Sequence, residues 1–122
     1  MFYCILCYNL ESEIEAWSRE KEAAVMVKRE MVAQKLANQG RLGPIGRLMP
    51  TTTAMTVRAR REPLVLDGPF AETKEQLLGF YVIDVANLDE ALDVARELAA
   101  ANPGGSYEVR PVALYHPDSR TG

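Results

Sequence analysis

Residues 79–101 decide the fold of this chain and read GFYVIDVANLDEALDVARELAAA. Gly79 to Val85 form a β-branched and aromatic run, which predicts a strand. Asn87 predicts the N-cap of a helix, with Glu90 as its reciprocal partner three residues later. The apolar residues of this helix recur at helical spacing and predict one buried face: Leu88, Ala91, Leu92, Ala95, Leu98 and Ala99. The stretch therefore predicts a strand followed by an amphipathic helix.

The N-terminal part of the chain has the same order. Residues 2–8 predict a strand, and residues 12–38 contain good helix formers with no Pro or Gly, which predicts one long helix. Ser12 and Glu15 predict its capping box, and Gly40 predicts its end. The apolar positions of this helix predict a core stripe: Ile14, Trp17, Ala24, Val25, Met31, Val32 and Leu36.

The remaining segments complete the pattern. Residues 41–50 are rich in Gly and Pro and fit either a short strand or a loop. Residues 53–60 and 64–66 predict the two arms of a β-hairpin, and residues 106–114 predict a last strand. Residues 116–122 form a polar tail, which we expect to fray. The order predicts an α+β fold of ferredoxin-like, split βαβ type with an inserted hairpin.

Both faces of the two central strands are largely apolar, which predicts cover on both sides of the sheet. A chain of 122 residues has no spare helices for the second face. The simplest cover is a second copy of the same sheet, so the pattern predicts a homodimer. The alternative is that the hairpin and the long first helix cover it.

Composition excludes several classes of function. The length fits a single domain, and the net charge of −3 disfavours nucleic acid as a partner. No apolar run reaches the ~20 residues of a membrane helix. The apolar N-terminus has no preceding Lys or Arg, so we interpret it as a strand and expect a cytoplasmic protein. Cys4 and Cys7 point to opposite faces of that strand, so we expect no disulfide, metal or cofactor there.

The segment from Asp67 to Glu75 is the best candidate for a binding site. Asp67, Gly68 and Pro69 indicate a turn, in which the carboxylate has a structural role. Alternatively, the segment lies at the mouth of a cleft and binds a small molecule. The side chains of Glu72, Lys74 and Glu75 would then converge on an apolar pocket.

Asp84 is a carboxylate on a strand with apolar neighbours, so it requires a partner or a raised pKa. Arg110 shares a face with Glu108 on the last strand and is a plausible partner for a strand carboxylate or a ligand anion. An internal salt bridge at the sheet end is the simpler interpretation. His116, the only histidine, lies in the tail and is expected to be exposed. Arg58, Arg60 and Arg61 fit a solvated hairpin edge.

Four stretches of this sequence resemble the DGPF type of YCII-related proteins: DGPFAETKEQL at 67–77, GFYVIDV at 79–85, NLDEA at 87–91 and EVRPV at 108–112. The resemblance implies one domain over residues 1–115 that forms a dimeric α/β barrel. One branch of that family is proposed to use a His–Asp pair. This chain departs from that pattern, because His116 lies elsewhere, so the mechanism is not carried over.

The sequence therefore predicts a module that binds or senses a small anionic or aromatic metabolite. The expected ligand residues are Asp67, Gly68, Pro69, Phe70, Glu72, Lys74, Glu75 and Arg110. The alternative is a cofactor-free isomerase or lyase, in which Asp67 or Asp84 acts as the base. Lys74 or Arg110 would then stabilise the developing negative charge. Whether the protein is an enzyme stays open.

Overall fold

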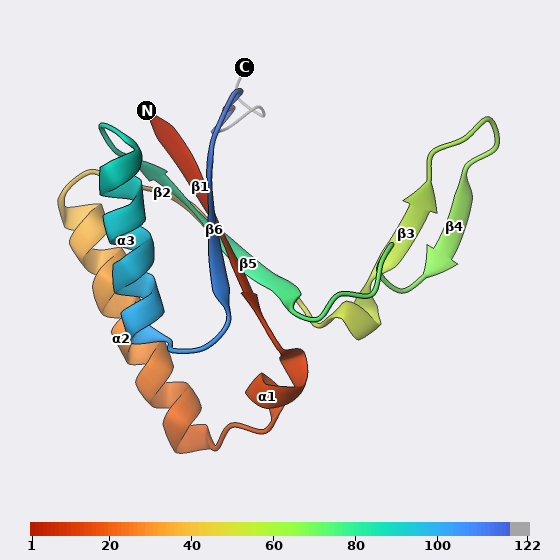
Figure 1. The fold of residues 1–122 in the computed structure, drawn as a ribbon, viewed down its shortest axis with the longest axis horizontal. Coiled ribbons are helices and arrows are strands. Elements are labelled where there is room, and N and C mark those ends of the chain that lie inside the picture. The colour runs from red at the N-terminus through yellow and green to blue at the C-terminus, as the bar shows by residue number, and fades with distance from the viewer. Residues whose placement is uncertain (118–122) are drawn as a thin grey trace.

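A computed structural model describes residues 1–117. Its main sheet has four antiparallel strands in the order β2-β5-β1-β6, and β3 and β4 form a separate two-stranded sheet (Figure 1). The elements are β1 (Phe2–Asn9), α1 (Glu11–Glu15), α2 (Arg19–Asn38), β2 (Leu42–Arg47), β3 (Met55–Arg58), β4 (Leu64–Asp67), β5 (Gln76–Asp84), α3 (Leu88–Ala101) and β6 (Ser106–Pro111), with a 3-10 turn at Thr51–Thr53. The predicted α+β fold of ferredoxin-like type is confirmed.

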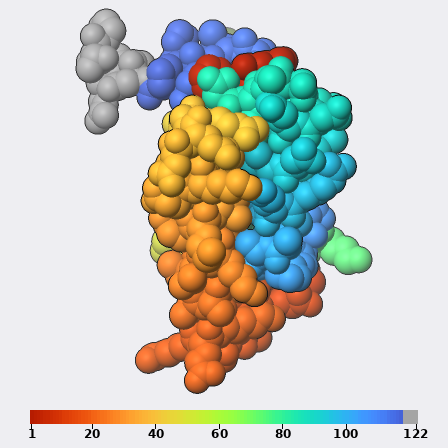
Figure 2. Space-filling view, turned by 90° about the vertical axis from the view of Figure 1, so that its left-hand side faces the viewer, coloured from red at the N-terminus to blue at the C-terminus, as the bar shows by residue number. Residues whose placement is uncertain are grey.

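The core lies between the main sheet and the helix pair α2 and α3. Alternate residues of β1 and β5 point toward the helices and are buried, as the two-residue period of a strand requires. Figure 2 shows α2 and α3 side by side, covering this face of the sheet. The main buried cluster consists of Tyr3, Ile5, Cys7, Leu36, Tyr81, Ile83, Val85, Ala91, Val94, Ala95 and Leu98.

The opposite face of the main sheet carries no helix, and we call it the open face (Figure 1). Phe2, Leu6 and Tyr8 of β1 and Phe80 of β5 lie on it and are half-buried. The ring of Phe80 lies against Gly46 of β2, where a side chain on the glycine would collide with it. The prediction that both faces of the central strands are apolar is therefore confirmed.

The long first helix predicted over residues 12–38 is wrong at its start. The chain makes the short helix α1, leaves it at Ala16, and begins α2 only after Ser18. The Ser18 hydroxyl accepts a hydrogen bond from the Lys21 N–H at 3.1 Å, so Ser18 is the N-cap. Ser12 caps nothing, because α1 begins after Leu10 and has no side-chain cap.

This break changes which apolar residues reach the core. Val25 and Leu36 are buried, and Ile14, Trp17 and Val32 are half-buried. Ala24 and Met31, which were predicted in the core stripe, are exposed, Met31 by 66%. The predicted stripe spans two helices, and a single helical period does not continue across the break between them.

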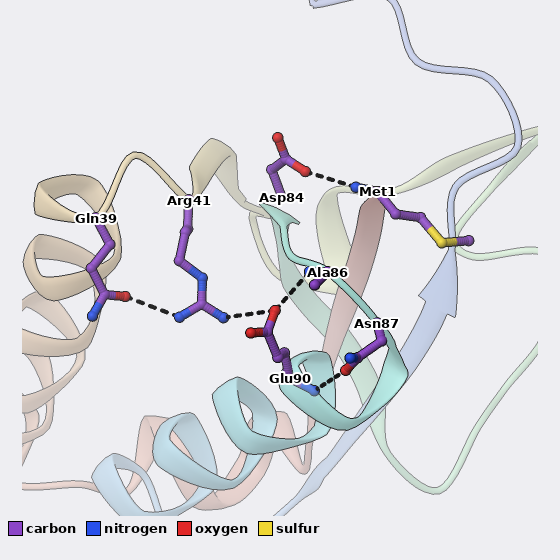
Figure 3. A network of polar contacts seen from close by, with 7 residues as sticks. All are labelled: Met1, Gln39, Arg41, Asp84, Ala86, Asn87 and Glu90. Carbon is purple, nitrogen blue, oxygen red and sulfur yellow. Dashed lines mark hydrogen bonds and ion pairs between the residues drawn. The ribbon is translucent and has the colours of Figure 1, made fainter.

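The predicted cap of α3 is confirmed. The Asn87 side chain accepts a hydrogen bond from the Glu90 N–H at 3.0 Å (Figure 3). The reciprocal bond differs from the predicted one: the Glu90 carboxylate accepts a hydrogen bond from the N–H of Ala86, the residue before Asn87, at 2.6 Å. It also lies 3.6 Å from the Arg41 guanidinium. These contacts tie the start of α3 to the turn between α2 and β2.

The last strand is shorter than predicted, because β6 ends at Pro111 instead of Leu114. The Gly- and Pro-rich residues 41–50 contain strand β2, and the hairpin is β3 and β4, as predicted. Of the expected tail, residues 118–122 lie outside the described residues. Within residues 1–117, no helix combines the length and apolar character that crossing a membrane requires.

Candidate functional site

A cavity of about 470 Å³ lies on the helix side of the sheet, at the end where α1 sits. The C-terminal ends of β1 and β2 and the start of β5 form its floor, and α1 and α2 flank it. Its lining residues include two arginines, Arg29 and Arg47, from separate elements. The larger apolar and aromatic lining residues are Tyr8, Ile14, Trp17, Leu48, Met49, Pro50, Leu78, Tyr81, Leu98 and Tyr107.

Arg29 is half-buried on the face of α2 that meets the sheet. Its Nε donates a hydrogen bond to the Tyr81 hydroxyl at 3.3 Å, which fixes the guanidinium over β5. This bond uses one of the five N–H groups of the guanidinium, which leaves donors for an anion.

Arg47 ends β2 and pairs with Gly79 of β5, so both residues face the helix side of the sheet. Gly79 cannot carry a side chain, because a Cβ there would collide with the Gly46 carbonyl oxygen. The glycine therefore allows β2 and β5 to approach closely beside the cavity. The cavity therefore receives positive charge from α2 and from β2.

The floor of the cavity contains neutral groups. Burial raises the pKa of the Cys7 thiol to about 11, although the charge of Arg29 opposes this shift. Burial likewise raises the pKa of Tyr107, whose hydroxyl donates to the Asn102 carbonyl at 3.4 Å. Both groups are protonated at neutral pH, so neither neutralises Arg29, and the thiol is a poor nucleophile.

Acidic residues of α1 and α2 lie at the rim. The Glu11 carboxylate accepts a hydrogen bond from the Thr51 N–H at 2.8 Å and a second from the Thr51 hydroxyl. It therefore joins α1 to the segment after β2. Glu15 and Glu22 also line the cavity, and both are exposed. Trp17 lies between them in sequence, with the Lys21 ammonium 5.0 Å from its ring centre.

None of the eight predicted ligand residues lines this cavity. Asp67 is exposed at the end of β4, and Phe70 is 75% exposed. Glu72 and Lys74 are exposed, and the half-buried Glu75 accepts a hydrogen bond from the Ser106 hydroxyl at 2.8 Å. The assignment of a ligand to this segment stays a prediction.

Asp84 and Arg110, the other two candidates, do not pair with each other in the described residues. Asp84 accepts a hydrogen bond from the N-terminal ammonium of Met1 at 2.9 Å, and both side chains are about half exposed (Figure 3). Arg110 is exposed on β6, opposite Cys4. The predicted salt bridge between Asp84 and Arg110 is therefore wrong. Asp84 of β5 pairs instead with the chain terminus at the start of the neighbouring strand β1, and β6 lies on the far side of β1.

The sequence analysis missed Arg29, and a signal for it was present. Val25, Arg29, Ala33 and Leu36 follow one another at helical spacing, and three of them are buried. A basic residue within a buried stripe is unusual and points to a partner or a ligand. Among residues 1–117, no group of His, Cys, Asp and Glu side chains could hold a metal ion.

Two comparisons with known proteins cover nearly the whole chain. A family model described as the YCII-related domain matches residues 1–115. An uncharacterized protein of Rhizobium meliloti (strain 1021) is 60% identical over 119 residues, which cover 96% of each chain. The match extends from the first strand through the last, and it includes every element that lines the cavity. On this basis, the chain belongs to the YCII-related family.

Proposed function

We propose that the cavity binds a small anionic molecule with an aromatic or apolar body. The observation that carries this proposal is the pairing of Arg29 and Arg47 with a largely apolar wall and a neutral floor. An arginine can donate two parallel hydrogen bonds to one carboxylate or phosphate, which fixes the orientation of the anion. The cavity volume falls within the ~300–1,000 Å³ typical of small-molecule sites.

Asn102 adds a polar atom to this wall. It is only 7% exposed, and its side-chain oxygen accepts no hydrogen bond from the described residues. A buried acceptor without a donor costs about 1–3 kcal/mol. The oxygen is covered in this structure, so a ligand hydroxyl or amino group would satisfy it once the Asn102 side chain turned toward the cavity. On this ground we favour an aromatic hydroxy acid or amino acid over a simple carboxylate.

We favour binding or sensing over catalysis. The isomerase or lyase alternative requires a carboxylate base beside the ligand, and neither Asp67 nor Asp84 lines the cavity. Cys7, which does line it, holds its proton at neutral pH. Of the three cavity carboxylates, Glu11 is already bonded to Thr51, and Glu15 and Glu22 are exposed to solvent. The chemistry of the site therefore supports recognition of an anion better than removal of a proton.

We also propose that two copies form a dimer through their open faces. Phe2, Leu6, Tyr8 and Phe80 leave apolar surface on that face, and burying it would stabilise the assembly by about 25 cal/mol per Å² before association costs. The resulting pair of sheets would form the α/β barrel that the sequence resemblance implies. The cavity lies on the helix side, and of these four open-face residues it shares only Tyr8.

A thermal-shift titration tests the ligand proposal. We expect benzoate, phenylacetate and 4-hydroxybenzoate to raise Tm, and the neutral analogue benzamide to have little effect, because it lacks the charge that the arginines recognise. Arg29→Met should abolish the shift. Arg96→Met is the matched control, because Arg96 is exposed and paired with Asp93 on the surface of α3. An equal shift with benzamide, or a full shift in Arg29→Met, would rule out the proposed anion site.

A further inference from the structure

The β3–β4 hairpin, which we call the arm, stands apart from the rest of the protein. Its strands pair only with each other, through Met55–Arg58 and Leu64–Asp67. Figure 1 shows the arm on the side of the main sheet that faces away from α2 and α3. An isolated two-stranded hairpin is marginally stable in water, so its own strands are not sufficient to hold it.

The arm presents apolar side chains to solvent on both faces. Val57 and Val65 lie directly opposite each other, and Met55 lies beside them on the same face. All three are more than half exposed. Leu64 and Leu66 are exposed on the other face. A contiguous apolar patch of this kind marks an interaction surface, whereas scattered single residues do not.

Two hydrogen bonds join the two ends of the arm to each other at its base. The Gly68 N–H donates to the Ala54 carbonyl at 2.7 Å, and the Thr56 hydroxyl donates to the Gly68 carbonyl at 2.7 Å. Gly68 has φ of +93°, a conformation that glycine adopts without strain. The Asp67–Phe70 segment therefore closes the hairpin at its base, and the exposed Phe70 adds apolar surface there.

Two observations indicate that the partner is a second copy of this chain. First, the arm stands on the same side of the main sheet as the open face, so a copy packed on the open face would lie next to it (Figure 1). Second, the arm tip is basic, with Arg58, Arg60 and Arg61 against Glu62, whereas the whole chain has a net charge of −3. The rest of a second copy therefore carries a larger net negative charge, which favours contact with a basic tip.

We propose that the β3–β4 hairpin is a dimerisation arm, which packs its Met55, Val57 and Val65 face against a second copy of this chain. Twofold symmetry makes the contact reciprocal, so each arm grips the other subunit and both patches are buried. This assigns the DGPF segment a structural role, as the fixed base of the arm. The proposal does not depend on the ligand of the cavity.

Sedimentation velocity and light scattering over a concentration series test the arm. Val57→Lys places a charge in the centre of the proposed contact and should raise the dimer Kd at least tenfold. Val27→Lys is the matched control, because Val27 and Val57 are the same residue type and each is 60% exposed. Val65→Lys, on the same face, should repeat the effect of Val57→Lys. Far-UV circular dichroism checks that each variant keeps the fold.

Leu6→Glu, on the open face, separates this proposal from that of the sheet-to-sheet dimer. Both the open-face contact and the arm contact are supported if the wild type is a dimer that Leu6→Glu and Val57→Lys each weaken and Val27→Lys leaves unchanged. If Leu6→Glu dissociates the dimer and Val57→Lys does not, the arm proposal is overturned and the open-face dimer stands. A wild-type monomer at micromolar concentration, or equal effects of Val27→Lys and Val57→Lys, also overturns the arm proposal.

Discussion

Gly105 illustrates how one residue fixes the geometry of the site. It precedes β6 with φ of +74°, and a Cβ at this position would collide with the Tyr8 carbonyl oxygen. The turn at Gly104 and Gly105 joins the end of α3, which carries Asn102, to the strand that carries Tyr107. Close approach of the backbone at Gly105 therefore sets the positions of two cavity residues.

Gly105→Ala should be much more destabilising than Gly68→Ala. Both positions have positive φ, which costs a non-glycine residue about 1–3 kcal/mol. Only Gly105 adds a collision, because no atom lies within 4 Å of a Cβ at Gly68. Urea denaturation of the two variants measures the difference in the free energy of unfolding. Equal losses would show that the contact with Tyr8 is not tight.

The buried thiol of Cys7 makes stability fall in alkaline solution. Its pKa rises from 9.0 to about 11 on folding, mainly through burial. The unfolded chain therefore loses this proton first, and the free energy of unfolding decreases as the pH rises from about 9 to 11. Cys7→Ala should reduce this slope, both because the thiol is gone and because the charge of Cys7 adds to the effect of burial in raising the pKa of Tyr107. Parallel curves for wild type and Cys7→Ala would contradict the buried thiol.

At the scale of the elements, α2 depends on a cap that the sequence pattern did not predict. Ser18→Ala should lower the free energy of unfolding by about 1 kcal/mol, because the Lys21 N–H loses its partner. Ser12→Ala should leave it nearly unchanged, since Ser12 is exposed and makes no cap. Chemical denaturation of both variants compares the two serines. A larger loss of unfolding free energy from Ser12→Ala than from Ser18→Ala would instead support the single long helix over residues 12–38.

The elements that the sequence predicted well are those with strong local signals. The β5 run and the Asn87 cap of α3 each rely on neighbouring residues, and both are confirmed. The break at Ala16–Ser18 has a weaker sequence signal. Ser18 can be recognised as the N-cap of α2 only when it is known that α1 ends before it. Some residues, such as Arg29 and Tyr81, are far apart in the sequence and meet only when α2 packs on the sheet. Their contact cannot be predicted from the spacing of residues in the sequence.

At the scale of the whole molecule, the two faces of the sheet have different roles. The helix side holds the core and, beside α1, the cavity with Arg29 and Arg47. The open face and the arm carry the apolar surface that the helices leave uncovered. The DGPF segment belongs to the second side, which explains why a distinctive motif contributes no residue to the cavity. In our proposals, this division separates the binding of a ligand from the contacts between two copies.

Trp17 provides the most direct test of the central claim, that the cavity binds an aromatic anion. It is the only tryptophan in the chain, and it lines the cavity. Titration with 4-hydroxybenzoate should give a saturable change in tryptophan fluorescence in the wild type and in Asp67→Asn, and none in Arg29→Met. The claim would be contradicted if the wild type gave no saturable change. It would also be contradicted if Asp67→Asn lost the change while Arg29→Met kept it.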